Sequence, residues 1–259
     1  MSPKEFRSIV KRGEWTESTS AACRGYAVAN LAIVPKELAF DFLLFCNRNP
    51  RPCPVLEVIE SGDPHTKLVA PGADLCTDVP KYRVYRDGKL IDEPTDITGY
   101  WRDDLVSFVI GCSDSWDWSL RAANIEFRVI GAYTTSIACV PAGRFRGHMV
   151  VTCRLMKDSY NAVRAVQITS RHTATHGPPI HIGNPAIIGI KDLYRPDICQ
   201  NPALGDVITP QEPDEVALFW GCGATPQIAA MESKVPFMIT HYPDHMFITD
   251  KLSEELAVL

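Results

Sequence analysis

The sequence lacks the charge blocks and long apolar runs that mark nucleic-acid-binding and membrane-spanning proteins. No block of five or more Lys or Arg occurs and the formal net charge is −5, so nucleic acid and anionic membranes are poor partners. No stretch approaches the roughly 18 apolar residues that a membrane-spanning helix needs. Residues 1–15 contain no apolar run, which argues against a signal peptide. We therefore expect a cytoplasmic protein.

Closely spaced cysteine pairs are also missing. The nine cysteines are scattered over 259 residues and none forms a C-x-x-C pair, which argues against a disulfide framework and a structural zinc site. We interpret most of them as small buried hydrophobes; Cys46 and Cys222 differ in having polar neighbours. No cofactor is predicted, although a divalent metal ion is left open. The sequence is also compatible with a homo-oligomer.

Hydrophobic periodicity predicts both helices and strands in a chain of ordinary globular composition, 46% hydrophobic and 22% charged. Residues 21–31 are compatible with a helix or a turn. Apolar residues at helical spacing predict helices over 1–12, 36–46, 103–111, 115–124 and 159–175. Alternating or continuous apolar runs predict strands over 55–59, 82–85, 133–140, 149–155, 186–190, 216–220 and 237–240.

These elements predict a mixed α/β (α+β) fold with two domains. The larger is a three-layer α/β domain made of residues 1–113 and 183–259. The smaller is an inserted two-layer α+β domain, residues 114–182, whose helix–strand–strand–helix order can bury a core of its own. Two strands of the larger domain lead directly into polar strings. Ligands of open α/β sheets bind outside the carboxyl ends of strands, so these strings are candidate sites.

The first string is W-G-C-G-A-T-P-Q at residues 220–227. Gly221 and Gly223 permit a close backbone approach, and Thr225 is placed to cap a helix whose free N–H groups would bind a carboxylate. The same field would favour a reactive Cys222 thiolate, and Gln227 adds a polar side chain. The simpler interpretation is a tight strand-to-helix turn with a buried cysteine.

The second string is T-H-Y-P-D-H-M-F-I-T-D at residues 240–250. Its His241 and His245 suit general acid–base catalysis near neutral pH. Pro243 lies between them, which makes a helix-borne metal pair doubtful. His172, His176 and His181 form a second histidine cluster, which ends in the string H-G-P-P-I-H-I-G. Any one of these histidines is equally compatible with a satisfied structural role.

The third string is F-C-N-R-N-P-R-P-C-P at residues 45–54. Arg48 is a candidate carboxylate clamp, because a guanidinium group matches a carboxylate with two hydrogen bonds. Asn47 and Asn49 are further candidate substrate-binding groups. The simpler interpretation is a capped helix end followed by an extended segment. Arg24 and Asp78 complete the predicted substrate-binding set, while Ser113, Asp114 and Asp117 are either functional or surface residues.

At these strings the sequence resembles the D-glutamate cyclase family, whose bacterial members are described as hydro-lyases of unknown substrate. The resemblance implies an α/β domain with a smaller α+β domain, and cyclisation of D-glutamate to 5-oxo-D-proline with loss of water. It brings no established catalytic assignment. The matching strings are A-C-R-G-Y-A-V-A-N-L, F-C-N-R-N-P-R-P-C-P-V-L-E-V, D-V-P-K-Y-R-V-Y-R-D-G, D-L-V-S-F-V-I-G-C-S, H-G-P-P-I-H-I-G-N-P, F-W-G-C-G-A-T-P-Q and I-T-H-Y-P-D-H-M-F-I-T-D.

The chain also departs from the family pattern. Cys76 stands where a basic residue is expected, and Thr135 where an Arg is common. Asp114, Trp116 and Asp117 replace a more apolar, Phe-rich segment. If these positions contact the substrate, the sequence leaves open a substrate other than D-glutamate.

Cyclisation of glutamate needs an anchored α-carboxylate, a deprotonated amine and a stabilised oxyanion. Our hypothesis gives the clamp to Arg48 with Arg24, proton transfer to His241 and His245, and oxyanion stabilisation to the backbone of 221–225 with Thr225 and Gln227. Two alternatives remain. One is a metal-assisted dehydratase of a hydroxy- or sugar-acid, and the other is a non-catalytic protein that binds a small carboxylate.

Overall fold

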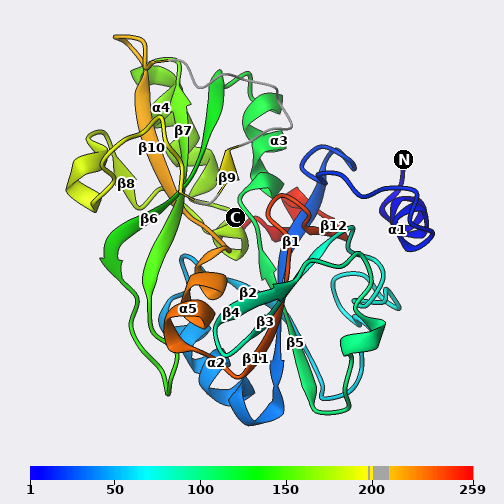
Figure 1. The fold of residues 1–259 in the computed structure, drawn as a ribbon. Helices are drawn as coiled ribbons and strands as arrows, with labels where there is room; N and C mark the ends of the chain where they lie inside the picture. The colour runs from blue at the N-terminus through cyan, green and yellow to red at the C-terminus, as the bar shows by residue number, and fades with distance from the viewer. Residues whose placement is uncertain (198, 201–209, 259) are drawn as a thin grey trace.

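The computed structural model describes residues 1–197, 199–200 and 210–258. In these residues helices pack against two antiparallel sheets (Figure 1), so the predicted mixed α/β class is confirmed. The helices are α1 (Pro3–Lys11), α2 (Lys36–Arg48), α3 (Asp114–Ala122), α4 (Ser159–Thr169) and α5 (Thr225–Ser233), with short 3-10 turns η1 (Thr98–Tyr100), η2 (Thr173–Thr175), η3 (Pro185–Ile188) and η5 (Ser253–Leu256).

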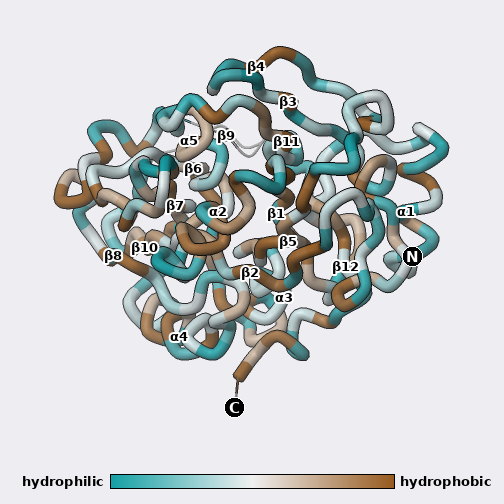
Figure 2. The backbone as a smooth tube through the Cα atoms, turned by 90° about the horizontal axis from the view of Figure 1, so that it is seen from below, coloured by the Kyte–Doolittle hydropathy of each residue, from teal (hydrophilic) through white to brown (hydrophobic). Residues whose placement is uncertain are grey.

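The first sheet has the strand order β2-β5-β1-β11-β3-β4, and β12 also pairs with β1. Its strands are β1 (Tyr26–Pro35), β2 (Val55–Ile59), β3 (Tyr82–Arg86), β4 (Lys89–Asp92), β5 (Leu105–Gly111), β11 (Phe237–His241) and β12 (Phe247–Leu252). The central strand β1 is buried along almost its whole length, because its alternate side chains pack into two hydrophobic cores, one on each face of the sheet. Figure 2 shows apolar chain at β1 and β5 near the middle of the molecule.

Two predictions for this sheet are wrong. The stretch 103–111 is the strand β5 and not a helix, and most of 21–31 lies in β1 and not in a helix or turn. Both are continuous apolar runs, and periodicity cannot separate a buried strand from a buried helix. Pairing decides instead: Leu31 lies opposite Val109 and Ala32 opposite Phe108 in the antiparallel register.

The second sheet has the order β8-β10-β7-β6-β9. Its strands are β6 (Phe127–Ala138), β7 (His148–Met156), β8 (His181–Ile182), β9 (Cys199–Gln200) and β10 (Val216–Gly221). Because β10 pairs with β7 from Val216 opposite Met156 to Gly221 opposite Val151, this sheet extends beyond residue 182. The predicted division at 182 therefore does not coincide with the division between the sheets.

The stretch 186–190, predicted as a strand, holds the 3-10 turn η3 instead. Pro185 begins this turn, and Gly189 ends it in the left-handed conformation with φ of 84°. A proline start and a left-handed glycine stop favour a helical turn over an extended strand. None of the helices in the described parts of the chain has the length and hydropathy that crossing a membrane requires.

Helix α3 joins the two sheets. The Oγ of Ser115 accepts a hydrogen bond from the Val28 nitrogen in β1 and donates one to the Val28 oxygen, both at 3.1 Å. One residue further, Trp116 packs against Trp220 of β10 with ring centroids 4.9 Å apart. Figure 1 shows α3 between the strands of the second sheet and β1. Side chains at the start of α3 therefore lie where the two sheets meet.

Candidate functional site

The turn after β10 fits tightly against the first sheet. A side chain at Gly221 would place its Cβ 2.7 Å from the Arg51 oxygen, and one at Gly223 would lie 1.9 Å from Asn30 Nδ2. Asn30 is itself buried and donates to the Gly111 oxygen at 2.9 Å. The expected close approach at the two glycines is therefore real, and its partners are other parts of the protein.

The residues between and after these glycines do not behave as expected. Thr225 is the first residue of α5 and not its N-cap, which is Ala224; its Oγ1 donates to the Cys222 oxygen and accepts from the Val150 nitrogen. Burial raises the pKa of Cys222 to about 12. A thiol at neutral pH is the opposite of the expected thiolate, because burial outweighs the hydrogen bond from the Ala224 nitrogen to Sγ.

A cavity of about 410 Å³ lies between the segment 19–28 and the first turns of α3. Its charged lining residues are Arg24, Asp114, Asp117 and Arg121. Among the residues predicted to bind substrate, Arg24 is the one that lines it. Asp114 and Asp117, which the sequence offers as either functional or surface residues, line it as well.

Behind this cavity lies Arg154 of β7, which is completely buried. Its Nε donates to Asp117 Oδ1 at 2.7 Å, and its Nη2 lies 3.6 Å from Asp114 Oδ1. The guanidinium carbon lies 4.3 Å from the centroid of the Trp116 ring and 5.6 Å from that of Trp220. A buried charge needs such partners, so this ion-pair network fixes the carboxylates at the cavity wall.

Asp117 has a raised pKa in spite of this network. Burial raises the pKa of this carboxyl to about 6, although the Arg154 charge acts in the opposite direction. Arg154 is not among the residues predicted from the sequence. Its one signal was an arginine within the apolar strand M-V-V-T-C-R-L-M, where an unpaired charge would be costly.

A second carboxyl with a raised pKa is Asp244, in the turn between β11 and β12. Burial, with a smaller contribution from Asp114, raises its pKa to about 7. Its backbone is left-handed, with φ of 63°, and its carbonyl accepts from the Thr19 nitrogen at 2.9 Å. Since Ser20 Oγ also donates to Asp114 Oδ2 at 2.9 Å, the segment 18–20 ties this turn to α3. Asp244 lies in the second polar string but is not among the residues predicted from the sequence.

The ring nitrogens of the two predicted catalytic histidines lie within hydrogen-bond distance of main-chain atoms. His241 Nδ1 accepts from the Leu31 nitrogen at 3.2 Å, and burial lowers its pKa to about 4, so the ring is neutral at pH 7. His245 Nδ1 lies 2.7 Å from the Pro243 oxygen and its Nε2 lies 3.0 Å from the Thr16 oxygen. Their part in catalysis stays a prediction.

The polar residues at the end of α2 tie this helix to the loop between β6 and β7. Asn49 donates to the oxygens of Phe45 and Val140, and its Oδ1 accepts from the Val140 nitrogen, all at 2.8 Å. Arg48 Nη1 donates to the Pro141 oxygen at 2.6 Å. Neither residue lines the cavity, and exposed Asn47 does not line it either. Their substrate-binding role stays a prediction.

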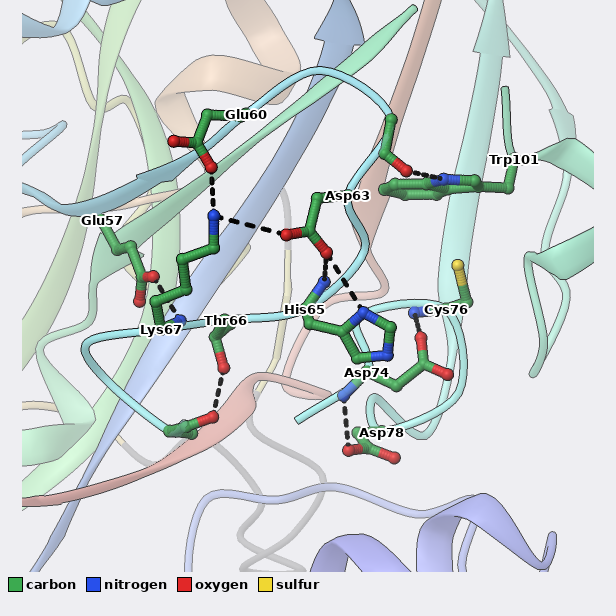
Figure 3. Close-up of polar contacts among 12 residues, drawn as sticks. Glu57, Glu60, Asp63, His65, Thr66, Lys67, Asp74, Cys76, Asp78 and Trp101 are labelled. Atoms are coloured by element: carbon green, nitrogen blue, oxygen red, sulfur yellow. Dashed lines mark hydrogen bonds and ion pairs between the residues drawn. The ribbon is translucent and has the colours of Figure 1, made fainter. Parts of the chain in front are cut away.

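The remaining predicted residues also have partners within the protein. Asp78 Oδ2 accepts from the Asp74 nitrogen at 2.9 Å, inside the looped segment after β2 drawn in Figure 3. His181 Nε2 lies 2.8 Å from the Asn184 oxygen. Gln227 Nε2 donates to the His241 oxygen at 3.2 Å. In the described residues, no group of three or more His, Cys, Asp or Glu is arranged to hold a metal ion.

Comparisons with known proteins give a consistent result. The family model described as D-glutamate cyclase matches residues 106–250. The chain is 51% identical to "Putative hydro-lyase GK2103" of Geobacillus kaustophilus (strain HTA426), over 100% of this chain and 98% of the relative. It is also 51% identical to "Putative hydro-lyase YcsI" of Bacillus subtilis (strain 168), over the full length of both.

Among solved structures, a nitrogen repressor-like protein from Methanococcus jannaschii superposes with a TM-score of 0.41 and 8% identity, covering 92% of this chain and 91% of that one. A likeness at this level says nothing about activity. The family model and the full-length relatives are decisive: this chain belongs to the D-glutamate cyclase family.

Proposed function

We propose that the protein is a hydro-lyase that cyclises D-glutamate to 5-oxo-D-proline with release of water. The relatives' names give the class of reaction, and the family model's description gives the substrate. The observation that carries the proposal is the cavity of about 410 Å³ that places two arginines and two aspartates around one space. Such a volume is typical of small-molecule sites.

The charges of the cavity suit an amino dicarboxylate. Glutamate carries two carboxylates and one ammonium group, so its net charge at pH 7 is −1. Arg24 and Arg121 at the wall, with Arg154 behind it, supply three positive charges against the two negative charges of Asp114 and Asp117. The difference of +1 is complementary to the substrate.

Each substrate group then has a partner. Arg24 and Arg121 bind the carboxylates, since guanidinium–carboxylate hydrogen bonds are strong and directional. Asp114 and Asp117 receive the ammonium group. Holding both ends of glutamate in one cavity brings its nitrogen toward the γ-carboxyl carbon, and this proximity lowers the barrier to ring closure. Burial makes His241 a weak base, with a pKa of about 4, and keeps Cys222 a thiol, with a pKa of about 12, so the proposal assigns proton transfer to neither.

A proton NMR time course with purified protein and separate D- and L-glutamate tests this proposal. We expect 5-oxoproline to accumulate from the D-isomer and not from the L-isomer. Loss of a charged hydrogen bond costs about 1.5–3 kcal/mol, so Arg24→Gln should raise KM roughly 10- to 100-fold. The matched control is Arg12→Gln, which removes another exposed arginine, one that pairs with Glu14 at 2.7 Å, and should leave KM unchanged.

Three results would replace the proposal. If neither isomer gives 5-oxoproline, the reaction is excluded. Activity that is lost with a chelator and restored by a divalent ion would favour the metal-assisted dehydratase. Thermal stabilisation by small carboxylates without turnover of any would favour a binding protein.

A further inference from the structure

The carboxylate of Asp117 is held at one oxygen and free at the other. Its Oδ1 accepts from Arg154 Nε at 2.7 Å, while its Oδ2 takes part in none of the hydrogen bonds found among the described residues. Asp117 also lines the cavity of about 410 Å³. A carboxylate anchored through one oxygen, with the other available, is the arrangement that a proton carrier needs.

The anchor itself is rigid. Arg154 is completely buried, and its Nη1 donates to Thr152 Oγ1 at 3.0 Å. Its guanidinium group packs on the rings of Trp116 and Trp220. The N–H groups of the guanidinium are hydrogen-bonded and its plane packs on aromatic rings. Arg154 therefore cannot turn easily, and it fixes the direction of the Asp117 carboxylate.

We propose that Asp117 carries protons from the substrate nitrogen to the departing oxygen, with Arg154 as its positioning residue. This inference rests on the proposed cyclisation of glutamate. Asp117 takes one proton from the ammonium group and passes it to the γ-carboxyl group. The freed amine attacks the γ-carbon, and a C–N bond forms. Asp117 then takes a second proton from nitrogen and passes it to the same oxygen, the C–O bond breaks, and water leaves.

This sequence balances without any co-reactant. The nitrogen loses two protons, the departing oxygen gains two, and Asp117 ends as it began. The charged groups facing Asp117 are Arg154 on β7, Asp114 and Arg121 on α3, and Arg24 across the cavity. Burial raises the Asp117 pKa to about 6, and Asp114 acts in the same direction, while Arg154 and Arg121 lower it. A carboxyl titrating there can both accept and return a proton near neutral pH.

The test compares two aspartates that make the same contact with an arginine. Asp104 Oδ1 accepts from Arg102 Nε at 2.8 Å, but this pair is exposed. We expect Asp117→Asn to lower kcat on D-glutamate on the order of 100-fold or more. Because Asp117 also helps to bind the ammonium group, KM should rise as well, but by less, about tenfold. The matched control Asp104→Asn should leave both unchanged. Asn keeps an oxygen that can accept from Arg154, and thermal melting checks that the variant is folded.

A second variant distinguishes a positioning role of Arg154 from a purely structural role. Arg154→Lys keeps the charge but loses the planar Nε–H donor. In the wild type, kcat/KM should rise with pH through about 6, because the carrier must be ionised. In the folded Arg154→Lys variant we expect kcat to fall with little change in KM. We also expect the rise of kcat/KM with pH to occur at a different pH from that of the wild type.

Two outcomes would overturn the inference, and they differ. An active wild type with a folded Asp117→Asn variant that keeps kcat within threefold would remove Asp117 alone. A wild type that forms no 5-oxoproline would remove the proposed function and this role together. An unchanged pH profile in an active Arg154→Lys variant would remove Arg154 as the positioning residue.

Discussion

The segments 45–54 and 113–118 are both rich in polar side chains, yet they use these groups differently. In the first, Asn49 makes three hydrogen bonds to the main chain and Arg48 makes one. In the second, Asp114 and Asp117 line a cavity, and the free Asp117 oxygen faces no partner among the described residues. The first segment holds two parts of the protein together, whereas the second presents groups to a ligand.

This contrast shows that polar density alone does not mark a site. Polar side chains next to Gly and Pro are needed both to fasten loops and to carry chemistry, because buried main-chain groups require partners. What separates the two uses is whether a polar atom is already satisfied within the protein. Three substitutions would sharpen or break the contrast.

The largest effect is expected from Arg154→Met. This change removes the partner of Asp117 and Asp114 and leaves their carboxylates uncompensated at the cavity wall. Breaking a buried ion pair in this way costs about 3–5 kcal/mol, measured as the free energy of unfolding in urea at pH 7. A loss below about 1 kcal/mol would show that the two carboxylates do not depend on Arg154.

The second effect is a change in the pH dependence of stability in His241→Asn. The folded pKa of His241 is about 4, below the ordinary 6.5, so between these values the unfolded state binds more protons. Stability therefore falls as pH drops, by about 2 kcal/mol between pH 7 and pH 5 for this one group. Asn can still accept from the Leu31 nitrogen but does not titrate, so its stability should fall less over this range. Equal decreases in variant and wild type would contradict the burial of a neutral imidazole.

Two carboxyl groups change the free energy of unfolding with pH in the direction opposite to His241. Asp244 and Asp117 have folded pKa values of about 7 and 6, above the ordinary 3.8, so their folded forms bind protons first and stability rises as pH falls toward 3.8. The comparison must therefore be made between His241→Asn and the wild type at each pH.

The smallest effect is expected from Arg48→Gln. Its hydrogen bond to the Pro141 oxygen is exposed, so its loss should cost about 0.5 kcal/mol or less and leave KM for D-glutamate unchanged. A tenfold rise in KM would instead support the clamp role that the sequence suggested for Arg48, and would place substrate at the end of α2.

Much of the fold could be predicted from local patterns. Helices α2, α3 and α4 and strands β2, β3, β7, β10 and β11 appear where periodicity placed them, to within a few residues or with a shorter end. The failures at β1 and β5 share one cause. Both are mostly apolar on both faces because a hydrophobic core covers each face of their sheet, and the pairing that makes them strands, such as Leu31 with Val109, joins residues about 80 apart in the sequence.

The site was harder to predict for a related reason. Arg24 was selected, and Asp114 and Asp117 were noted, because their polar types stand out in an apolar context. Arg154 and the raised pKa of Asp244 were not, since both depend on burial created by distant segments. Burial and charge proximity, which set a pKa, are not properties of a local string.

The sequence by itself determined the family, the mixed α/β class and the positions of most elements, because these follow from hydrophobic periodicity and from long ordered motifs. Only the tertiary structure decided which polar groups are satisfied and which face a cavity. Hydrogen bonds and ion pairs form between residues that the fold brings together, as when Arg154 of β7 meets Asp117 of α3. The proposed site depends on this ion pair between two distant segments, and neither residue alone defines it.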